Sequence, residues 1–165
     1  MNTEQLLKYS LFDNFTNQEI QHFLKIIKIK KYKMNETVIK ENEIGDSIML
    51  LLEGTVNVTK ALTIQINSIK EPEKEFSKLN ANQYPFFGEI SVFNNNKRTA
   101  TIKAETECEI GILYNKDLIK ISENDHELGY KIMTNISKKL IDDLLITNSQ
   151  VLKLTTAFSL ILDKK

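Results

Sequence analysis

The stretch Phe87-Gly88-Glu89-Ile90-Ser91-Val92-Phe93-Asn94-Asn95-Asn96-Lys97-Arg98-Thr99-Ala100-Thr101 combines features of an anion-binding site. A glycine precedes a short apolar turn of helix, a polar loop follows, and Arg98 is expected to open a strand. Gly88 lets backbone approach a ligand closely because it lacks a Cβ atom. The amides of Ile90 and Ser91 are expected at the start of the helical turn, where N–H groups attract anions. Arg98 would meet the same anion with two parallel donors.

Glu89 indicates what kind of anion this site would hold. A carboxylate repels phosphate, but it accepts hydrogen bonds from the hydroxyl groups of a sugar. Phosphate held by Arg98 and backbone amides, with ribose held by Glu89, describes a nucleotide pocket. Plainer interpretations are an exposed Arg98 in a weak surface ion pair and a solvated Glu89 favoured by the helix dipole. Ser91 also fits as a small residue whose hydroxyl is unused.

Short segments that alternate apolar and polar residues surround this stretch, from about residue 28 to residue 114. A period of two is typical of half-buried strands. Strands are expected at 37–39, 47–52, 56–58, 62–66, 76–79, 100–104 and 108–112. Turn-forming residues separate these segments. Many short strands between turns predict a mainly β fold, an antiparallel sandwich or roll.

Helical patterns precede and follow the strands. Thr16 and Glu19 fit a capping box, and apolar residues then recur at helical spacing: Ile20, Phe23, Leu24 and Ile27. After residue 114 a short helix is expected over 115–121, and a long one from near Asn124.

The long C-terminal helix has apolar residues at steps of three or four. They are Met133, Ile136, Leu140, Leu144, Val151, Leu154 and Phe158. This seam is compatible with pairing to a second helix and equally with packing on the chain's own sheet. The segment 158–162 favours an intermolecular contact, because it is too apolar to suit water.

Composition excludes several classes of protein. The chain has 165 residues, about the length of one domain, and its 22 basic residues balance 22 acidic ones. Zero net charge argues against a general nucleic-acid binder. One cysteine and two histidines exclude a disulfide framework, a multi-cysteine zinc site and a histidine-rich metal centre. No apolar run approaches the ~20 residues of a membrane span, and residues 1–5 lack signal-peptide features, so a cytoplasmic protein without membrane contact is expected.

The quoted stretch resembles the phosphate-binding cassette of the cyclic-nucleotide-binding domain family, whose pattern runs Phe-Gly-Glu, a small helix and then Arg-x-Ala. The step from Glu89 to Arg98 matches the spacing in kinase regulatory subunits of that family. The resemblance continues at 32–38, 41–54 and 104–114, and it covers roughly residues 10 to 155.

The chain departs from the family pattern at two turns and one loop. Asn35 and Asn42 stand where the family commonly has glycine. Asparagine is the non-glycine residue that best tolerates left-handed backbone, so the turns are expected to survive. The segment 80–86, which leads into the cassette, lacks the Gly-Asp pair that is usual in the family and carries Pro85. The sequence therefore does not define the shape of this entry loop.

The resemblance implies a site for cAMP or cGMP. It maps onto Phe87, Gly88, Glu89, Ile90, Ser91, Arg98, Thr99, Ala100 and Asp143. In the family, threonine at position 99 is often associated with cGMP, although cAMP-preferring members also carry it. Asp143 falls on the helix that covers the base, where an acid can accept from guanine N1 and N2. It equally fits a solvated acidic face with Asp142, so the sequence does not decide between the two purines.

We therefore expect an antiparallel β-roll of the jelly-roll, or double-stranded β-helix, type in one domain. N-terminal helices would cover residues 1–27, the roll 28–114 with its cassette at 87–101, and C-terminal helices 115–165. The given sequence has no DNA-binding domain after Lys165, so direct DNA binding is not expected unless the chain is a piece of a longer protein.

The expected function is that of a stand-alone sensor without catalysis, metal or cofactor. It would bind a cyclic nucleotide and transmit binding through the C-terminal helix, in a homodimer or to an effector protein. One alternative is the same roll with an empty pocket, acting as a dimeric scaffold. A cupin-like enzyme is the other, and it would need a histidine cluster that two distant histidines, His22 and His126, do not supply.

Overall fold

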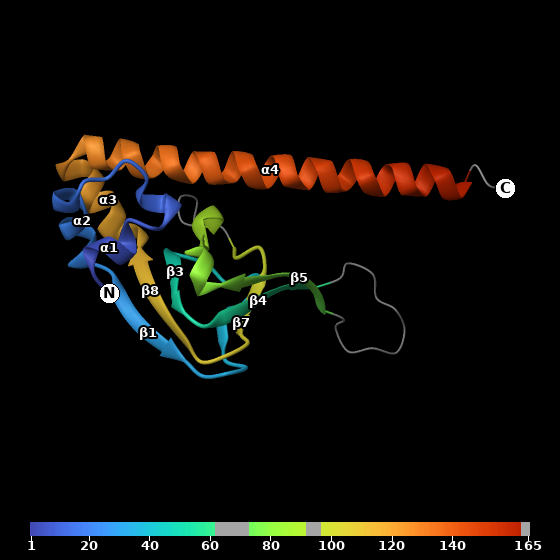
Figure 1. Ribbon diagram of the computed structural model, residues 1–165, viewed down its shortest axis with the longest axis horizontal. Coiled ribbons are helices and arrows are strands. Elements are labelled where there is room, and N and C mark those ends of the chain that lie inside the picture. Colours follow the sequence, from blue (N-terminus) through green and yellow to red (C-terminus); the bar gives the residue numbers. More distant parts are fainter. Residues whose placement is uncertain (62–72, 92–96, 163–165) are drawn as a thin grey trace.

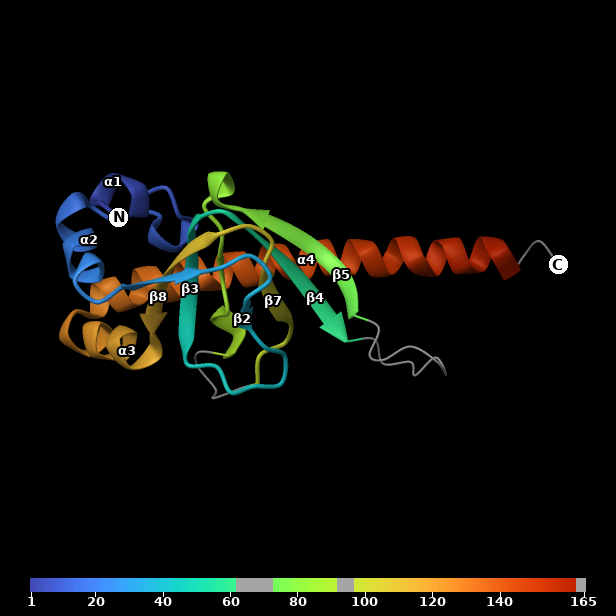
Figure 2. The ribbon, with the colours of Figure 1, turned by 90° about the horizontal axis from the view of Figure 1, so that it is seen from below.

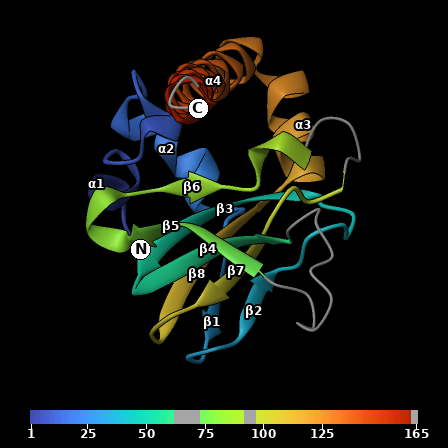
Figure 3. The same ribbon diagram turned by 90° about the vertical axis from the view of Figure 1, so that its right-hand side faces the viewer.

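Two antiparallel sheets close into a β-roll in the computed structural model, which describes residues 1–61, 73–91 and 97–162. One sheet has the strand order β1-β8-β3-β6 and the other β2-β7-β4-β5; Figure 3 shows them stacked below α4. The strands are β1 (Lys28–Tyr32), β2 (Thr37–Ile39), β3 (Ser47–Glu53), β4 (Thr55–Ala61), β5 (Glu73–Asn80), β6 (Phe86–Phe87), β7 (Thr101–Ala104) and β8 (Cys108–Tyr114). The predicted mainly β roll is confirmed.

Strand positions follow the alternating pattern closely. The predicted strands at 37–39, 47–52, 56–58, 76–79, 100–104 and 108–112 correspond to β2, β3, β4, β5, β7 and β8. The one predicted at 62–66 lies outside the described residues. The alternation of apolar and polar residues does not indicate β1. Four of the five residues of this strand are exposed, and three of these four are lysines. Within the described residues β1 is an edge strand paired only with β8, where exposed lysines discourage edge-to-edge association.

β3 separates the two hydrophobic clusters of the domain. Successive side chains of a strand point to opposite faces, so Ile48, Leu50 and Leu52 pack with the helices. Met49 and Leu51 point to the interior of the roll. Burial of both faces explains the nearly uninterrupted apolar sequence of this strand.

The N-terminal helices pack at one end of the roll, beside the start of α4 (Figure 2). They are α1 (Thr3–Leu6), the 3₁₀ helix η1 (Ser10–Phe12) and α2 (Asn17–Leu24). The predicted capping box is confirmed: Glu19 Oε2 accepts from Thr16 N at 2.7 Å, and Thr16 Oγ1 accepts from Glu19 N at 3.3 Å. Edge-to-face contacts among Phe12, Phe15 and Phe23 fill the space beneath α2.

Two helices follow the roll, α3 (Asn115–Asn124) and the long α4 (His126–Leu162). The first part of α4 is fixed to the domain. Asn135 Nδ2 donates to the carbonyl oxygens of Leu11 and Asp13 at 3.0 and 2.9 Å, and Lys131 pairs with Glu19 at 2.6 Å. Polar contacts as well as apolar packing therefore fix its direction across the roll.

The second part of α4 projects beyond the roll (Figure 1). From Leu140 to Leu162 every residue is exposed. Ile136, predicted to belong to the helix seam, is instead buried in the domain's own core at 2% exposure. Packing on the chain's own domain is therefore confirmed for the part up to Ile136. The part from Leu140 has no packing partner among the described residues, and its pairing with a second helix stays a prediction.

By length and composition, α4 also satisfies the criteria for a membrane-crossing helix. A window of 18 residues, none of them buried, reaches a mean hydropathy of 1.2. This part of α4 is not an uninterrupted apolar run, because neutral polar residues and Lys153 separate its apolar residues. One such helix is weak support for membrane insertion.

Candidate functional site

The predicted anion-binding stretch begins on β6 and turns at Gly88. β6 pairs with β3 through Phe86 and Phe87, which fixes the start of the loop to the core. Gly88 has a φ of +85°, a conformation that side chains with a Cβ atom rarely adopt. The next residues, Glu89–Ser91, form the 3₁₀ helix η3. The predicted turn of helix is therefore a single 3₁₀ turn in the described residues.

Arg98 is buried against this turn, with 7% of its surface exposed. Its Nη1 lies 2.8 Å from the Gly88 carbonyl oxygen, 2.8 Å from Ser91 Oγ and 2.9 Å from the Ser47 carbonyl oxygen. Its Nη2 donates to Ser47 Oγ at 3.0 Å. The interpretation of Arg98 as an exposed surface arginine is therefore wrong.

The backbone at Arg98 does not open a strand as expected. β7 begins at Thr101, and Arg98 instead exchanges hydrogen bonds with the turn before β3: Arg98 N donates to Glu43 O at 2.7 Å, and Asn42 N donates to Arg98 O at 2.9 Å. The left-handed Asn42, at φ +69°, shapes that turn. Gly45 leaves room for the Arg98 side chain, because a Cβ atom at position 45 would lie 2.3 Å from Arg98 Nε.

Burial and nearby acids act in opposite directions on Arg98. Removal from water lowers the pKa of the Arg98 guanidinium, and the charges of Asp46 and Glu89 raise it in part. An arginine stays charged under all ordinary conditions. A permanent positive charge is thus held beneath the Gly88 turn.

Glu89 is buried as well, with 4% of its surface exposed, so it is not the solvated carboxylate of the plainer interpretation. Its Oε1 accepts from Lys139 Nζ on α4 at 2.7 Å. Lys139 also donates to Asp143 Oδ2, one turn further along α4, at 2.6 Å. Burial lowers the pKa of the Lys139 ammonium, but the charge of Glu89 and the hydrogen bond to Asp143 outweigh burial, so the net pKa is raised.

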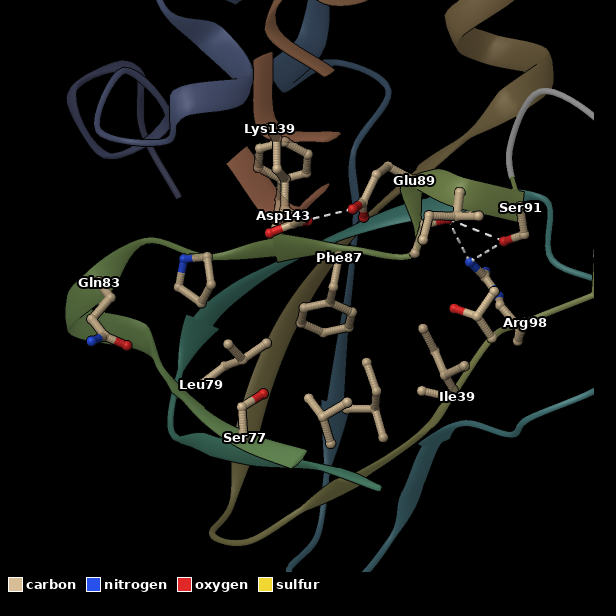
Figure 4. Close-up of a pocket in the computed structure, with 18 of the residues that line it drawn as sticks. Ile39, Ser77, Leu79, Gln83, Phe87, Glu89, Ser91, Arg98, Lys139 and Asp143 are labelled. Atoms are coloured by element: carbon tan, nitrogen blue, oxygen red, sulfur yellow. Dashed lines mark hydrogen bonds and ion pairs between the residues drawn. The ribbon is translucent and has the colours of Figure 1, made fainter. Parts of the chain in front are cut away.

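These groups line one cavity of about 450 Å³ between the roll and α4 (Figure 4). All nine residues predicted for the site line it. Thr99 and Ile90 are exposed, and Asp143 lines the cavity from α4 with 52% of its side chain exposed. Apolar side chains form the opposite wall, among them Ile39, Val58, Leu79 and Ile102. An apolar pocket of this size with a few converging polar groups suits a small organic ligand.

Sequence reasoning missed three residues at this site. Lys139 pairs with both acids, Ser47 holds the Arg98 guanidinium, and Gly45 leaves room for it. The spacing of four between Lys139 and Asp143 indicates a helical ion pair, and it is the one available signal. The pairing with Glu89 spans 50 residues and leaves no local pattern. Among the described residues, no cluster of three potential ligands could hold a metal ion.

Residues 29–125 match the family model of the cyclic nucleotide-binding domain, which is more than half of the chain. The chain belongs to this family. Among curated members, a putative potassium channel protein of Rhodopseudomonas palustris is 23% identical over 132 residues, which is 80% of this chain and 30% of that protein. A cAMP-activated global transcriptional regulator of Salmonella typhimurium is 28% identical over 127 residues, 76% of this chain and 56% of the regulator. The chain thus spans about a third to a half of the length of these two relatives.

Solved structures share the cyclic nucleotide-binding fold. A domain from Methylobacillus flagellatus superimposes with a TM-score of 0.77 at 23% identity, covering 91% of this chain and 80% of that one. The regulatory domain of Toxoplasma gondii PKA, crystallised with cAMP, gives 0.69 at 20% identity, covering 86% and 49%. At these identities the likeness establishes the fold alone.

Proposed function

We propose that this chain is a regulatory module that binds a cyclic nucleotide in the cavity between the roll and α4. The observation that carries the proposal is the placement of two buried charges of opposite sign, Arg98 and Glu89, on the wall of one cavity. A cyclic nucleotide offers a phosphate monoanion and a ribose hydroxyl on one rigid frame. The cation Arg98 complements the phosphate, and the carboxylate of Glu89 complements the ribose hydroxyl.

Each side chain has a part in this proposal. Arg98 binds the phosphate, beside Gly88 and Ser91, and Glu89 accepts a hydrogen bond from the ribose. Phe87, Ile90 and Ala100 shape the wall, and Thr99 and Asp143 face the base. Family membership supports this mapping, and the relatives include a cAMP-activated regulator and a cGMP-dependent protein kinase of Caenorhabditis briggsae. We leave the purine open between adenine and guanine.

We propose binding without catalysis and without a metal or cofactor of its own. The matched family is a binding domain. The buried, unpaired Cys108 suits a reducing compartment such as the cytoplasm.

The output of the module is proposed to pass through α4. Its exposed apolar residues, including Leu144, Val151, Leu154 and Phe158, are continuous with the part that borders the cavity at Lys139 and Asp143. A second copy of this chain is the partner we favour, because the residues repeat at helix-pairing spacing. If the protein does not dimerise, an effector protein or a membrane surface is the alternative partner for this part of α4.

Calorimetric titration with cAMP and with cGMP tests the binding proposal. The protein is first unfolded, dialysed and refolded to remove any bound nucleotide, and 5′-AMP serves as a non-cyclic control. Saturable binding of either cyclic nucleotide supports the proposal. Absence of binding by both at millimolar concentration overturns it and favours the dimeric scaffold with an empty pocket.

A further inference from the structure

Four charged groups meet at the cavity, and their charges balance. Arg98 and Lys139 are cations, Glu89 and Asp143 are carboxylates, and all four line the same space (Figure 4). Arg98 is held by Ser47, Gly88 and Ser91, whereas Lys139 bridges the two acids. The buried Glu89 therefore has its direct ion pair with α4 and not with the arginine of the cassette.

We propose that Lys139 is a positioning residue of the nucleotide site: its ammonium compensates the buried Glu89 carboxylate and joins α4 to a bound nucleotide through that carboxylate. The inference rests on the proposed function. Without Lys139, a phosphate monoanion would enter a cavity with two carboxylates and one cation. With Lys139 present, the two cations balance the two carboxylates before the ligand arrives, and the contact with Lys139 orients Glu89 as an acceptor.

Lys139 is expected to stay on Glu89 when the nucleotide binds. A neutral sugar hydroxyl does not replace a cation beside a buried carboxylate, because an uncompensated buried charge is costly. A carboxylate has about four lone-pair sites, so it accepts from Lys139 and from a hydroxyl at once. The ammonium of Lys139 also makes a cation–π contact, with Nζ 5.4 Å from the centre of the Phe86 ring. The ligand, Glu89, Lys139 and α4 then form one connected chain.

The test compares Lys139→Met with Lys138→Met, the exposed neighbour on the same helix. We expect Lys139→Met to weaken binding of both cAMP and cGMP about tenfold or more, the loss typical of a charge-assisted hydrogen bond. Lys138→Met should leave both affinities unchanged, and Lys139→Arg should restore most of the loss because it returns the charge. A Lys139→Met protein that binds as tightly as the parent, or more tightly, overturns the inference and would make Lys139 an internal competitor for Glu89.

A double-mutant cycle separates this role from a general structural one. In the Glu89→Gln background, where no buried carboxylate remains for Lys139 to compensate, Lys139→Met should cost far less affinity than in the parent, because contacting residues are not additive. Equal costs in the two backgrounds overturn the inference. The double variant also removes the unpaired buried charge, so it remains measurable if Lys139→Met alone unfolds. Parent protein that binds neither nucleotide overturns the proposed function as well, whereas parent binding with an unaffected Lys139→Met overturns only this inference.

Discussion

The Arg98 guanidinium binds the turn that carries its own proposed ligand site, with Nη1 2.8 Å from the carbonyl oxygen of Gly88. The same group reaches Ser47 at the start of β3. Arg98 thus connects the Gly88 turn to the central strand, and a phosphate would be recognised by a side chain that also holds the pocket together. Binding and stability are therefore expected to change together at this position.

Replacement of Arg98 by lysine should separate charge from geometry. Lysine keeps the positive charge but lacks the planar fork that reaches several acceptors. We expect nucleotide affinity to fall roughly tenfold or more, and the nucleotide-free protein to melt at a lower temperature. Lys97→Ala, at the exposed adjacent position, is the matched control. Parental affinity and melting temperature in Arg98→Lys would contradict the assignment.

A bound cyclic nucleotide should raise the melting temperature. At a concentration 100 times Kd, linkage contributes about 2.7 kcal/mol to the free energy of unfolding. A domain of this size gains about 2–4 °C per kcal/mol, so the expected rise is roughly 5–11 °C. Differential scanning fluorimetry of refolded protein measures it, with 5′-AMP as control. A rise of the same size with 5′-AMP would show that recognition does not require the cyclic phosphate.

Gly45→Ala should weaken the site although residue 45 makes no proposed ligand contact. The added Cβ would lie 2.3 Å from both Arg98 Nε and Ser91 Oγ, so the guanidinium must shift. We expect lower nucleotide affinity together with a lower melting temperature. Ile44→Ala, a change at the exposed neighbour, should leave affinity at the parental value. A Gly45→Ala protein that binds normally would show that Arg98 tolerates displacement.

Acidic substitutions on the exposed face of α4 should dissociate a dimer. Leu144 and Phe158 are 58% and 68% exposed, and burying each in a partner contact would contribute about 1.5–3 kcal/mol. Leu144→Asp and Phe158→Asp should sediment as monomers, whereas Ser149→Asp, on the opposite face of the helix, should not change the mass. Parent protein that sediments as a monomer with and without nucleotide excludes the dimer. Flotation with lipid vesicles then tests the membrane outcome.

Purine choice is expected to depend on Asp143. A carboxylate accepts from guanine N1–H and N2–H, whereas adenine offers one donor and the lone pair of N1. Asp143→Ala should therefore lower cGMP affinity more than cAMP affinity, by no more than about 1.5–3 kcal/mol, and Thr99→Ala should do so more weakly. Because Lys139 also contacts Asp143, part of the loss is expected to be common to both nucleotides. Equal losses, or a larger loss for cAMP, would remove the preference for guanine.

Local sequence patterns are sufficient to predict much of the secondary structure of this protein. Alternating segments located five of the strands, because a strand exposes opposite faces at successive residues, and a continuous apolar run located β3. The capping box located the start of α2, since Thr16 and Glu19 act within one turn. Asn35 and Asn42 were expected to support left-handed turns in place of glycine, and their φ values are +67° and +69°. In each case the interaction is between residues close in the chain.

The partners of the charged side chains at the site depend on contacts between residues far apart in the chain. Arg98 reaches Ser47 across 51 residues, and Glu89 reaches Lys139 across 50, so neither pairing leaves a periodic pattern. The division of α4 is decided in the same way: Ile136 and Leu140 are one turn apart and equally apolar, yet the first is buried and the second exposed. The apolar spacing of a helix defines a face, but the length over which that face is covered depends on where the rest of the domain ends.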